Sequence, residues 1–310
     1  MASDGLAIGG KIRSFFGLSR MTHSVLDIAH PAVGAVLVLG GGLPRPATVV
    51  IGLAAAFAGF TAVFALNDVM DCGVDCEKMS KYRKRGECFD IDSVGLRHPI
   101  AQGTLSFRSA LAWVIVWGAA ALVLAYLLNP VCSALMLVAA GLEIGYCRLL
   151  RVTHWKALLS GLMVAVGGLA GVYAVSAAPS PRIVAIFVLW AFAWEVGCRN
   201  IPNDWSDLEE DVHLGIRTVP VRYGRRASAW ISFSLLCVTV ASSLLFPFLV
   251  AVSHPLPYLA GAAAAGGFLL IAPAALWLKR QTTQSAMFFF NRACFYPLAV
   301  FAVTAVLAVV

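Results

Sequence analysis

The stretch NDVMDCGVD at residues 67–75 follows directly on the apolar run IGLAAAFAGFTAVFAL and decides how the chain is interpreted. The same pattern, N-D-x-x-D-x-x-x-D, returns as NDWSDLEED at residues 203–211, again after a long apolar segment. We call these stretches the first and second acidic motifs; their carboxylates are Asp68, Asp71 and Asp75, and Asp204, Asp207 and Asp211. The i, i+3, i+7 spacing places each set on one face if the helix continues. One motif alone is as consistent with a solvated helix end, but the repetition favours two sites that hold divalent metal against a polyanion.

The composition assigns the chain to the membrane. Hydrophobic residues make up 60% of the 310 positions, charged residues only 13%, and the mean hydropathy is +0.83. Soluble domains carry about 25% charged residues. The chain is therefore expected to be a polytopic membrane protein.

Apolar stretches of roughly 18–25 residues predict membrane-spanning helices. They lie near residues 24–43, 47–67, 108–128, 131–149, 157–177, 183–203, 229–252, 257–278 and 288–309. The predicted fold class is an all-α integral membrane bundle of nine transmembrane helices with cytoplasmic cap loops. Residues 1–310 form a single transmembrane domain in this interpretation.

The distribution of basic residues orients the bundle. All of the 23 Lys and Arg residues except Arg45 and Arg182 fall on one side of the nine predicted spans. The positive-inside rule then places the N-terminal segment 1–22 in the cytoplasm, with the active-site loops 68–107 and 204–228. We expect a multi-pass protein of the cell (inner) membrane. The net charge of +7 is a topology signal and requires no nucleic acid partner.

A diphosphate head group on a long apolar tail suits this arrangement of charges. Mg²⁺ prefers oxygen ligands and usually binds through one or two carboxylates together with substrate phosphates. Two such ions would neutralise the charge that builds on a departing diphosphate. An allylic diphosphate ionises to a carbocation, so no nucleophilic side chain is needed, and the chain carries no G-x-S-x-G, P-loop or H-E-x-x-H motif.

With these motifs the chain resembles the UbiA superfamily of intramembrane prenyltransferases over nearly its whole length. The family signature N-D-x-x-D-x-x-x-D matches residues 67–75, and D-x-x-D-x-x-x-D followed by G-x-x-T-x-P-x-x-x-G matches residues 204–224. The R-P-[IL]-x-x-G segment matches residues 97–103 with His98 inserted between Arg and Pro. The segment Y-x-x-x-[KR]-R matches residues 146–151 with Leu150 in place of the first basic residue. The resemblance implies a nine-helix bundle with its active site on the cytoplasmic side.

The motifs and the resemblance together assign roles to individual residues. Catalytic roles are expected for Asp68, Asp71, Asp204 and Asp207, and Mg²⁺ ligands for these four together with Asp75 and Asp211. The diphosphate is expected to contact Asn67, Arg83, Lys84, Arg97, Arg151, Asn203 and Arg217. The acceptor or prenyl pocket is expected to include His30, Tyr146, Arg148, Trp194, Glu195 and Arg199. For Glu195 and Arg199, one turn apart, a structural ion pair is an equally good interpretation.

Two alternatives concern the metal and the class of protein. Cys72, Cys76, Cys88 and His98 form another candidate metal set, but their spacing lacks the common C-x-x-C form of zinc sites. An ion-coupled transporter would also carry membrane carboxylates, yet here the acids lie at helix ends beside Lys and Arg rather than at mid-span.

The predicted function is Mg²⁺-dependent transfer of a prenyl group from a polyprenyl diphosphate to a small acceptor. The first choice of acceptor is an aromatic acid of quinone biosynthesis, of the 4-hydroxybenzoate or hydroxynaphthoate type. A glycerol-phosphate or sugar-phosphate lipid precursor is the alternative. The expected partners are the diphosphate, the acceptor and the lipid bilayer, and no protein partner is inferred.

Overall fold

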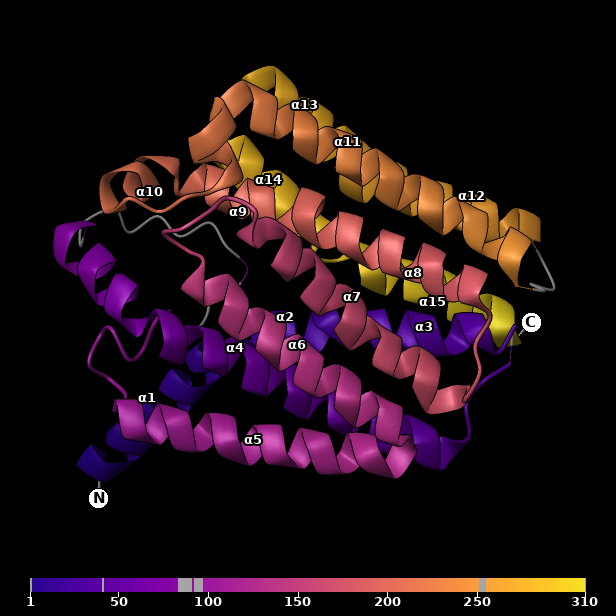
Figure 1. Cartoon of the computed structure of the whole chain (residues 1–310), viewed down its shortest axis with the longest axis horizontal. Coiled ribbons are helices and arrows are strands. Elements are labelled where there is room, and N and C mark those ends of the chain that lie inside the picture. Colours follow the sequence, from indigo (N-terminus) through magenta and orange to yellow (C-terminus); the bar gives the residue numbers. More distant parts are fainter. Residues whose placement is uncertain (1, 41, 83–90, 92–96, 251–254, 310) are drawn as a thin grey trace.

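The computed structural model describes residues 2–40, 42–82, 91, 97–250 and 255–309, and within them the chain is helical without strands (Figure 1). The α-helices are α1 (Ala2–Leu18), α2 (Met21–Asp27), α3 (Ala29–Val38), α4 (Pro46–Tyr82), α5 (Phe107–Leu128), α6 (Pro130–Arg148), α7 (Lys156–Val175), α8 (Pro181–Trp194), α9 (Ile201–Ser206), α10 (Leu208–Leu214), α11 (Val219–Leu249), α12 (Pro255–Ala265), α13 (Ala272–Arg280), α14 (Thr283–Ala293) and α15 (Tyr296–Val309). Two π-helical turns, η2 (Glu195–Asn200) and η3 (Gly266–Ile271), interrupt this series.

Nine stretches of the described chain are long and apolar enough to cross a membrane, which confirms the predicted number. They are Met21–Val38, Pro46–Ser80, Phe107–Leu128, Pro130–Arg148, Lys156–Val175, Pro181–Ser206, Val219–Leu249, Pro255–Arg280 and Thr283–Val306. Several spans are composite: α8, η2 and α9 form the sixth, and α14 with α15 forms the ninth. Helix α1 and the end of α15 lie at opposite ends of the bundle (Figure 1), as an odd number of spans requires.

Local sequence signals determine where the helices begin. Ser106 precedes α5 and its side chain accepts a hydrogen bond from the Ser109 backbone N–H. Asn129 precedes α6 in the same way, with Pro130 in the first turn of the helix. Such caps satisfy amide groups that have no partner within the helix. They explain the short joint between the third and fourth spans.

The helices pack closely where small residues meet. A Cβ atom on Gly171 of α7 would lie 1.9 Å from the carbonyl oxygen of Pro31 on α3, so only glycine fits at this crossing. Close backbone approach through small residues is a general basis of helix association in membranes. At the second acidic motif, the buried indoles of Trp205 and Trp277 pack edge to face with ring centroids 5.6 Å apart.

Two helices extend further than predicted. Helix α4 continues through the first acidic motif to Tyr82, so residues 68–82 of the predicted loop are helical. Helix α11 begins at Val219 rather than near residue 229, and Gly224 bends it at a φ of +80°. The Thr218 side chain caps this helix and Pro220 lies in its first turn. Hydropathy alone missed both extensions because the added turns are polar.

These extensions bring the two acidic motifs to one end of the bundle. The last turns of α4 and helices α9 and α10 lie together at the left of Figure 1, at the same end as α1. Helix α4 contacts α10 directly, and Lys78 on α4 forms an ion pair with Asp207 between α9 and α10. The acidic motifs therefore face one another across a shared space.

Candidate active site

A cavity of 840 Å³ lies between the two acidic motifs and extends inward among the helices. Its wide part is lined by carboxylates and basic side chains from both motifs. Its inner part is lined by apolar and aromatic side chains, which include Val63, Phe64, Met163, Met287 and Phe290. A charged head and an apolar tail thus have matching surfaces within one space.

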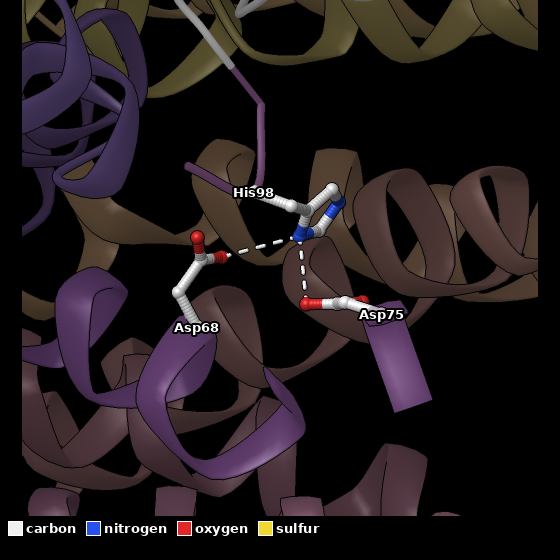
Figure 2. Close-up of side chains that lie close together, drawn as sticks. All are labelled: Asp68, Asp75 and His98. Carbon is white, nitrogen blue, oxygen red and sulfur yellow. Dashed lines mark ion pairs between the residues drawn. The ribbon is translucent and has the colours of Figure 1, made fainter. Parts of the chain in front are cut away.

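A histidine contacts two carboxylates of the first acidic motif. The Nδ1 atom of His98 lies 2.8 Å from Asp75 Oδ2 and 3.4 Å from Asp68 Oδ1, and Figure 2 shows the imidazole between the two carboxylates. Burial of the ring opposes its charged form, but the two carboxylates outweigh this effect and raise the pKa of His98. The residue inserted into the family segment is therefore part of the site.

A hydrogen-bonded chain anchors the start of the first motif. The Asn67 side-chain amide donates to Glu143 Oε1 on α6 at 2.7 Å and accepts from Arg20 at 3.0 Å. The same Arg20 guanidinium lies 3.9 Å from Asp68 Oδ1. Glu143 is buried, and a buried carboxylate needs such a partner. Asn67 thus connects α4 to α6 and to the turn between α1 and α2.

Lysines from other helices form ion pairs with the carboxylates of the second acidic motif. Lys78 Nζ lies 2.6 Å from Asp207 Oδ2 and 3.4 Å from Glu210 Oε2. Burial of Asp207 favours its neutral form, but the Lys78 ammonium outweighs this effect and holds the pKa of Asp207 below its usual value. At Asp211, burial and the adjacent charge of Asp204 raise the pKa instead. One carboxylate of this motif is thus stabilised as an anion, while at another the neutral form is favoured.

A second lysine lies beneath this motif. Lys156 is 1% exposed, and its Nζ lies 3.8 Å from Asp204 Oδ1. It donates to the Tyr146 hydroxyl at 3.0 Å and lies 4.3 Å from the centroid of that ring. The Asn200 amide donates to the same hydroxyl at 3.3 Å. This network fixes a cation where the charged and apolar parts of the cavity meet.

The inner end of the cavity carries a neutralised arginine. Arg199 donates to Asp27 Oδ2 at 2.6 Å and lies 3.4 Å from Glu195 Oε2. Ser160 donates to the other Glu195 oxygen at 2.6 Å. The ring of Trp194 lies 5.4 Å from the guanidinium carbon. The ion-pair interpretation of Glu195 and Arg199 is thus correct, although both residues also line the cavity.

The structure brings most of the predicted site residues together. Those that line the cavity are Asn67, Asp71, Asp75, Arg97, Tyr146, Glu195, Arg199, Asn203, Asp204, Asp207 and Asp211. Asp68 is buried directly beside it, in contact with His98. The candidates Arg83 and Lys84 lie outside the described residues.

Five of the predicted residues lie elsewhere. His30 and Trp194 are buried against one another, with ring centroids 4.5 Å apart, rather than on the cavity surface. Arg148 is exposed, Arg151 pairs with Glu77 at 2.5 Å, and Arg217 donates to the Val152 carbonyl at 3.1 Å. Arg148 is the last residue of α6, whereas Arg151 and Arg217 lie in the connections between helices, and none of the three lines the cavity.

Sequence reasoning missed several residues of the cavity, notably Arg20, Lys78, Lys156, Ser160 and Asn200. Lys78 could have been found, because it extends the i, i+3, i+7 series of the first motif by one further step on the same helix face. Lys156 carried a weaker signal, as a cation at the start of an apolar span. The other three become visible only once the helices are packed.

The residues at both motifs fit divalent cations. Each set offers carboxylate oxygens, the ligands that Mg²⁺ prefers. The buried oxygens Asp68 Oδ2 and Asp204 Oδ2 have no hydrogen-bond partner among the described residues. An unpartnered buried carboxylate oxygen is unfavourable unless a ligand completes it. Of the cysteine alternative, Cys88 lies outside the described residues, and within them His98 is grouped with Asp68 and Asp75 and not with Cys72 or Cys76.

Named relatives share most of the chain. It is 26% identical over 282 residues to the digeranylgeranylglyceryl phosphate synthase of Natronomonas pharaonis, a match that covers 89% of this chain and 88% of the relative. It is 25% identical over 265 residues to 4-hydroxybenzoate geranyltransferase 2 of Lithospermum erythrorhizon, with 84% and 80% covered. Neither relative is a transporter.

The fold matches a solved structure, and a family model matches the sequence. The structure of a UbiA homolog from Archaeoglobus fulgidus bound to GPP and Mg²⁺ superimposes with a TM-score of 0.67, at 18% identity, covering 94% of this chain and 99% of that one. The model of the UbiA prenyltransferase family matches residues 28–295. The chain therefore belongs to the UbiA prenyltransferase family and is a multi-pass membrane protein.

Proposed function

We propose that the protein transfers a prenyl group from a prenyl diphosphate to a hydroxyl-bearing acceptor in a reaction that requires Mg²⁺. The observation that carries this proposal is the cavity itself, with two acidic motifs at its wide part and an apolar inner surface. The GPP and Mg²⁺ bound to the Archaeoglobus fulgidus homolog support the same pairing of ligand and ion.

Each acidic motif would hold Mg²⁺ through its carboxylates, which are Asp68, Asp71 and Asp75, and Asp204, Asp207 and Asp211. When bound, the ion would offset the negative charge of the diphosphate. Lys78 and Lys156 lie at this level and can contact phosphate oxygens, as can Arg97. Asn67 and Asn203 stay in the proposal as cavity-lining polar groups, and Arg83 and Lys84 as candidates from outside the described residues.

The inner surface would receive the prenyl chain and exclude water from the carbocation. The Phe64 ring centroid lies 5.7 Å from the Arg199 guanidinium carbon, and Phe290, Met163 and Met287 line the same cavity. Aromatic faces stabilise positive charge, and a dry cavity keeps water from capturing the cation. The Arg199 charge is already neutralised by Asp27 and Glu195, so it does not oppose this chemistry.

The same neutralisation bears on the acceptor. An acceptor carboxylate placed beside Arg199 would also meet Asp27 and Glu195, and like charges at such distances repel strongly. An acceptor that brings only its hydroxyl to Glu195 and Ser160, with its anionic group at the mouth, avoids this repulsion. A glycerol-phosphate lipid precursor has that shape, and the relative from Natronomonas pharaonis is named for such a product. We therefore rank it first.

A phenolic acid of the 4-hydroxybenzoate type is the second candidate acceptor. It was the first choice from sequence, and the observation in its favour is the resemblance to 4-hydroxybenzoate geranyltransferase 2 over 84% of the chain. The cations first considered for its carboxylate were Arg199, Arg148 and Arg151. Arg199 is paired and the other two lie away from the cavity, which weakens this choice.

The test uses the full-length protein in lipid nanodiscs with Mg²⁺ and labelled geranylgeranyl diphosphate. Separate reactions contain a prenylated glycerol phosphate, a sugar phosphate or 4-hydroxybenzoate, and the Asp204→Asn variant is the control. A lipid product from the first acceptor is expected. Product from hydroxybenzoate alone would reverse the ranking, and the absence of diphosphate consumption with every acceptor would contradict prenyl transfer.

The orientation in the membrane is part of the proposal. The N-terminal segment and the active site are proposed to face the cytoplasm, because nearly all Lys and Arg residues lie on that side. Reporter fusions at residues 178–180 should then report the outside, and fusions at residues 83–86 the cytoplasm. Equal signals from both positions would contradict this orientation.

A further inference from the structure

His98 gives the first acidic motif a nitrogen donor that the second motif lacks. One ligand atom each from Asp68, Asp75 and His98 lie within 4.8 Å of one another, and Figure 2 shows the imidazole directed between the carboxylates. The nitrogen lies 2.8 Å and 3.4 Å from the two carboxylate oxygens. Ligands that surround one cation at ~2.1 Å are themselves separated by about 3 Å. The donors are therefore already spaced for a shared ion.

A separate observation indicates that this group lacks a ligand. The Asp68 residue is 3% exposed, and its Oδ2 atom has no hydrogen-bond partner among the described residues. Arg20 does not supply one, because its nearest contact is to the other oxygen at 3.9 Å. A buried carboxylate oxygen without a partner is unfavourable, and a metal ion would satisfy it.

The basic groups at the two motifs differ in chemical type. Lys78 and Lys156 at the second motif are ammonium groups, which compete with a metal ion for carboxylates. An imidazole, unlike an ammonium group, offers a ring nitrogen that ligates metal ions. Imidazole suits first-row transition metals such as Fe²⁺ and Zn²⁺ best. Mn²⁺ binds most weakly in that series, but it still accepts a nitrogen ligand more readily than Mg²⁺, which prefers oxygen ligands. The two motifs therefore differ in the cation that suits them.

We propose that His98 joins Asp68 and Asp75 in a mixed nitrogen–oxygen metal site that binds a first-row transition-metal dication such as Mn²⁺ more tightly than Mg²⁺. The second motif, with oxygen donors only, remains a site for Mg²⁺. This inference deepens the proposed function, since it assigns different cations to the two metal positions of the same cavity. It involves no change in the oxidation state of the metal.

The binding test follows Mn²⁺ by electron paramagnetic resonance with the purified full-length protein in detergent. Free Mn²⁺ gives a strong signal that decreases on binding, and Mg²⁺ is added as competitor. The wild type should retain one bound Mn²⁺ in an excess of Mg²⁺. His98→Gln should lower the affinity for Mn²⁺ at least ~10-fold, with a much smaller change for Mg²⁺. His213→Gln, at an exposed histidine of α10 outside the cavity, is the matched control and should bind as the wild type does.

A second measurement needs no variant and covers the case in which His98→Gln fails to fold. Electron spin echo modulation of Mn²⁺ bound to the wild type should show coupling to an imidazole ¹⁴N nucleus. Its absence, or equal Mn²⁺ affinity in wild type and folded His98→Gln, would overturn the inference. Prenyl transfer would stand in that case, because Mg²⁺-dependent turnover is assayed separately. Conversely, loss of turnover with every metal would contradict the proposed function and leave the Mn²⁺ result to decide on His98.

Discussion

The two acidic motifs share the pattern N-D-x-x-D-x-x-x-D but have different surroundings. The first lies in an unbroken α-helix and is matched by the imidazole of His98. The second follows a π-helical turn and is matched by Lys78 from α4 and Lys156 from α7. Identical spacing of carboxylates thus does not give identical geometry, because the helix continues through the first motif but breaks at Asp207 in the second. Residues from other helices specify the charge that each motif meets. The difference teaches that a repeated motif need not be a repeated site.

The largest effect is expected where the second motif depends on a buried cation. Lys156→Met leaves Asp204 buried without its counter-charge and should lower the free energy of unfolding by about 3–5 kcal/mol. Lys78→Met, at the more open end of the same motif, should lower it by about 1 kcal/mol or less. Denaturant titration in detergent, without added metal, measures both. Equal losses would mean that depth in the bundle does not separate the two lysines.

The motifs should be equally necessary for turnover despite their different surroundings. Asp68→Asn and Asp204→Asn should each reduce kcat/KM at least ~10²-fold, because each removes a charge that holds the metal against the diphosphate. Steady-state assays with Mg²⁺ measure this. Glu77→Gln is the matched control on α4, since Glu77 pairs with the exposed Arg151 outside the cavity. Full activity in either aspartate variant is incompatible with metal binding at that motif.

The outermost carboxylates offer a sharper comparison. Asp75→Asn and Asp211→Asn should reduce kcat/KM about 10-fold each, less than the inner positions, because both residues lie one turn farther along and act partly through other groups. Asp75 contacts His98 directly, whereas Asp211 is adjacent to Asp204 and has a raised pKa. Steady-state assays of both variants, which give kcat/KM and the KM for the diphosphate, test this prediction. If one of the two substitutions reduced kcat/KM ten times more than the other, the two outer carboxylates would contribute unequally to turnover.

The smallest effect is expected at a basic residue that belongs to neither motif. Arg151→Gln removes a half-exposed ion pair with Glu77, which is worth about 0–1 kcal/mol. Turnover and KM should therefore remain close to those of the wild type. A marked rise in KM for the diphosphate would return Arg151 to the binding site, as the sequence motif alone suggested.

The number and position of the membrane spans could be predicted, because each span is a local apolar stretch and the Lys and Arg residues add up along the whole chain. Apolar length and the one-sided distribution of Lys and Arg identified the nine spans. The acidic spacing identified a shared helix face for the first motif, whereas the helix of the second motif breaks at Asp207. Contacts between helices could not be predicted in this way. Whether Arg199 meets Asp27, or Lys156 meets Asp204, depends on packing that no single-chain pattern encodes. Arg148 and Arg151 show the converse, since nearness in sequence placed them at a site that they do not reach.

His98 illustrates why a departure from a family pattern is hard to interpret from sequence. As an extra residue before Pro99 it departed from the family segment, and the sequence offered it as a metal ligand only beside Cys72, Cys76 and Cys88. In the structure it adopts a φ of +51°, a left-handed conformation that is uncommon for residues other than glycine, and so directs its ring between two carboxylates. The information needed was a backbone angle, and no residue type encodes it alone.

The π-helical turn η2 has a consequence for how the sixth span can change. A π turn is in effect one residue inserted into an α-helix, and each residue of an α-helix rotates the chain by about 100°. Every residue of η2 is buried, and the second motif begins three residues after it ends. Removal of one residue between Glu195 and Asn200 would leave an apolar helix of nearly unchanged length, with Asp204 turned toward a neighbouring helix. The hydropathy of the span would hardly change. The one additional residue of η2 therefore determines the direction in which the carboxylates of the second motif point.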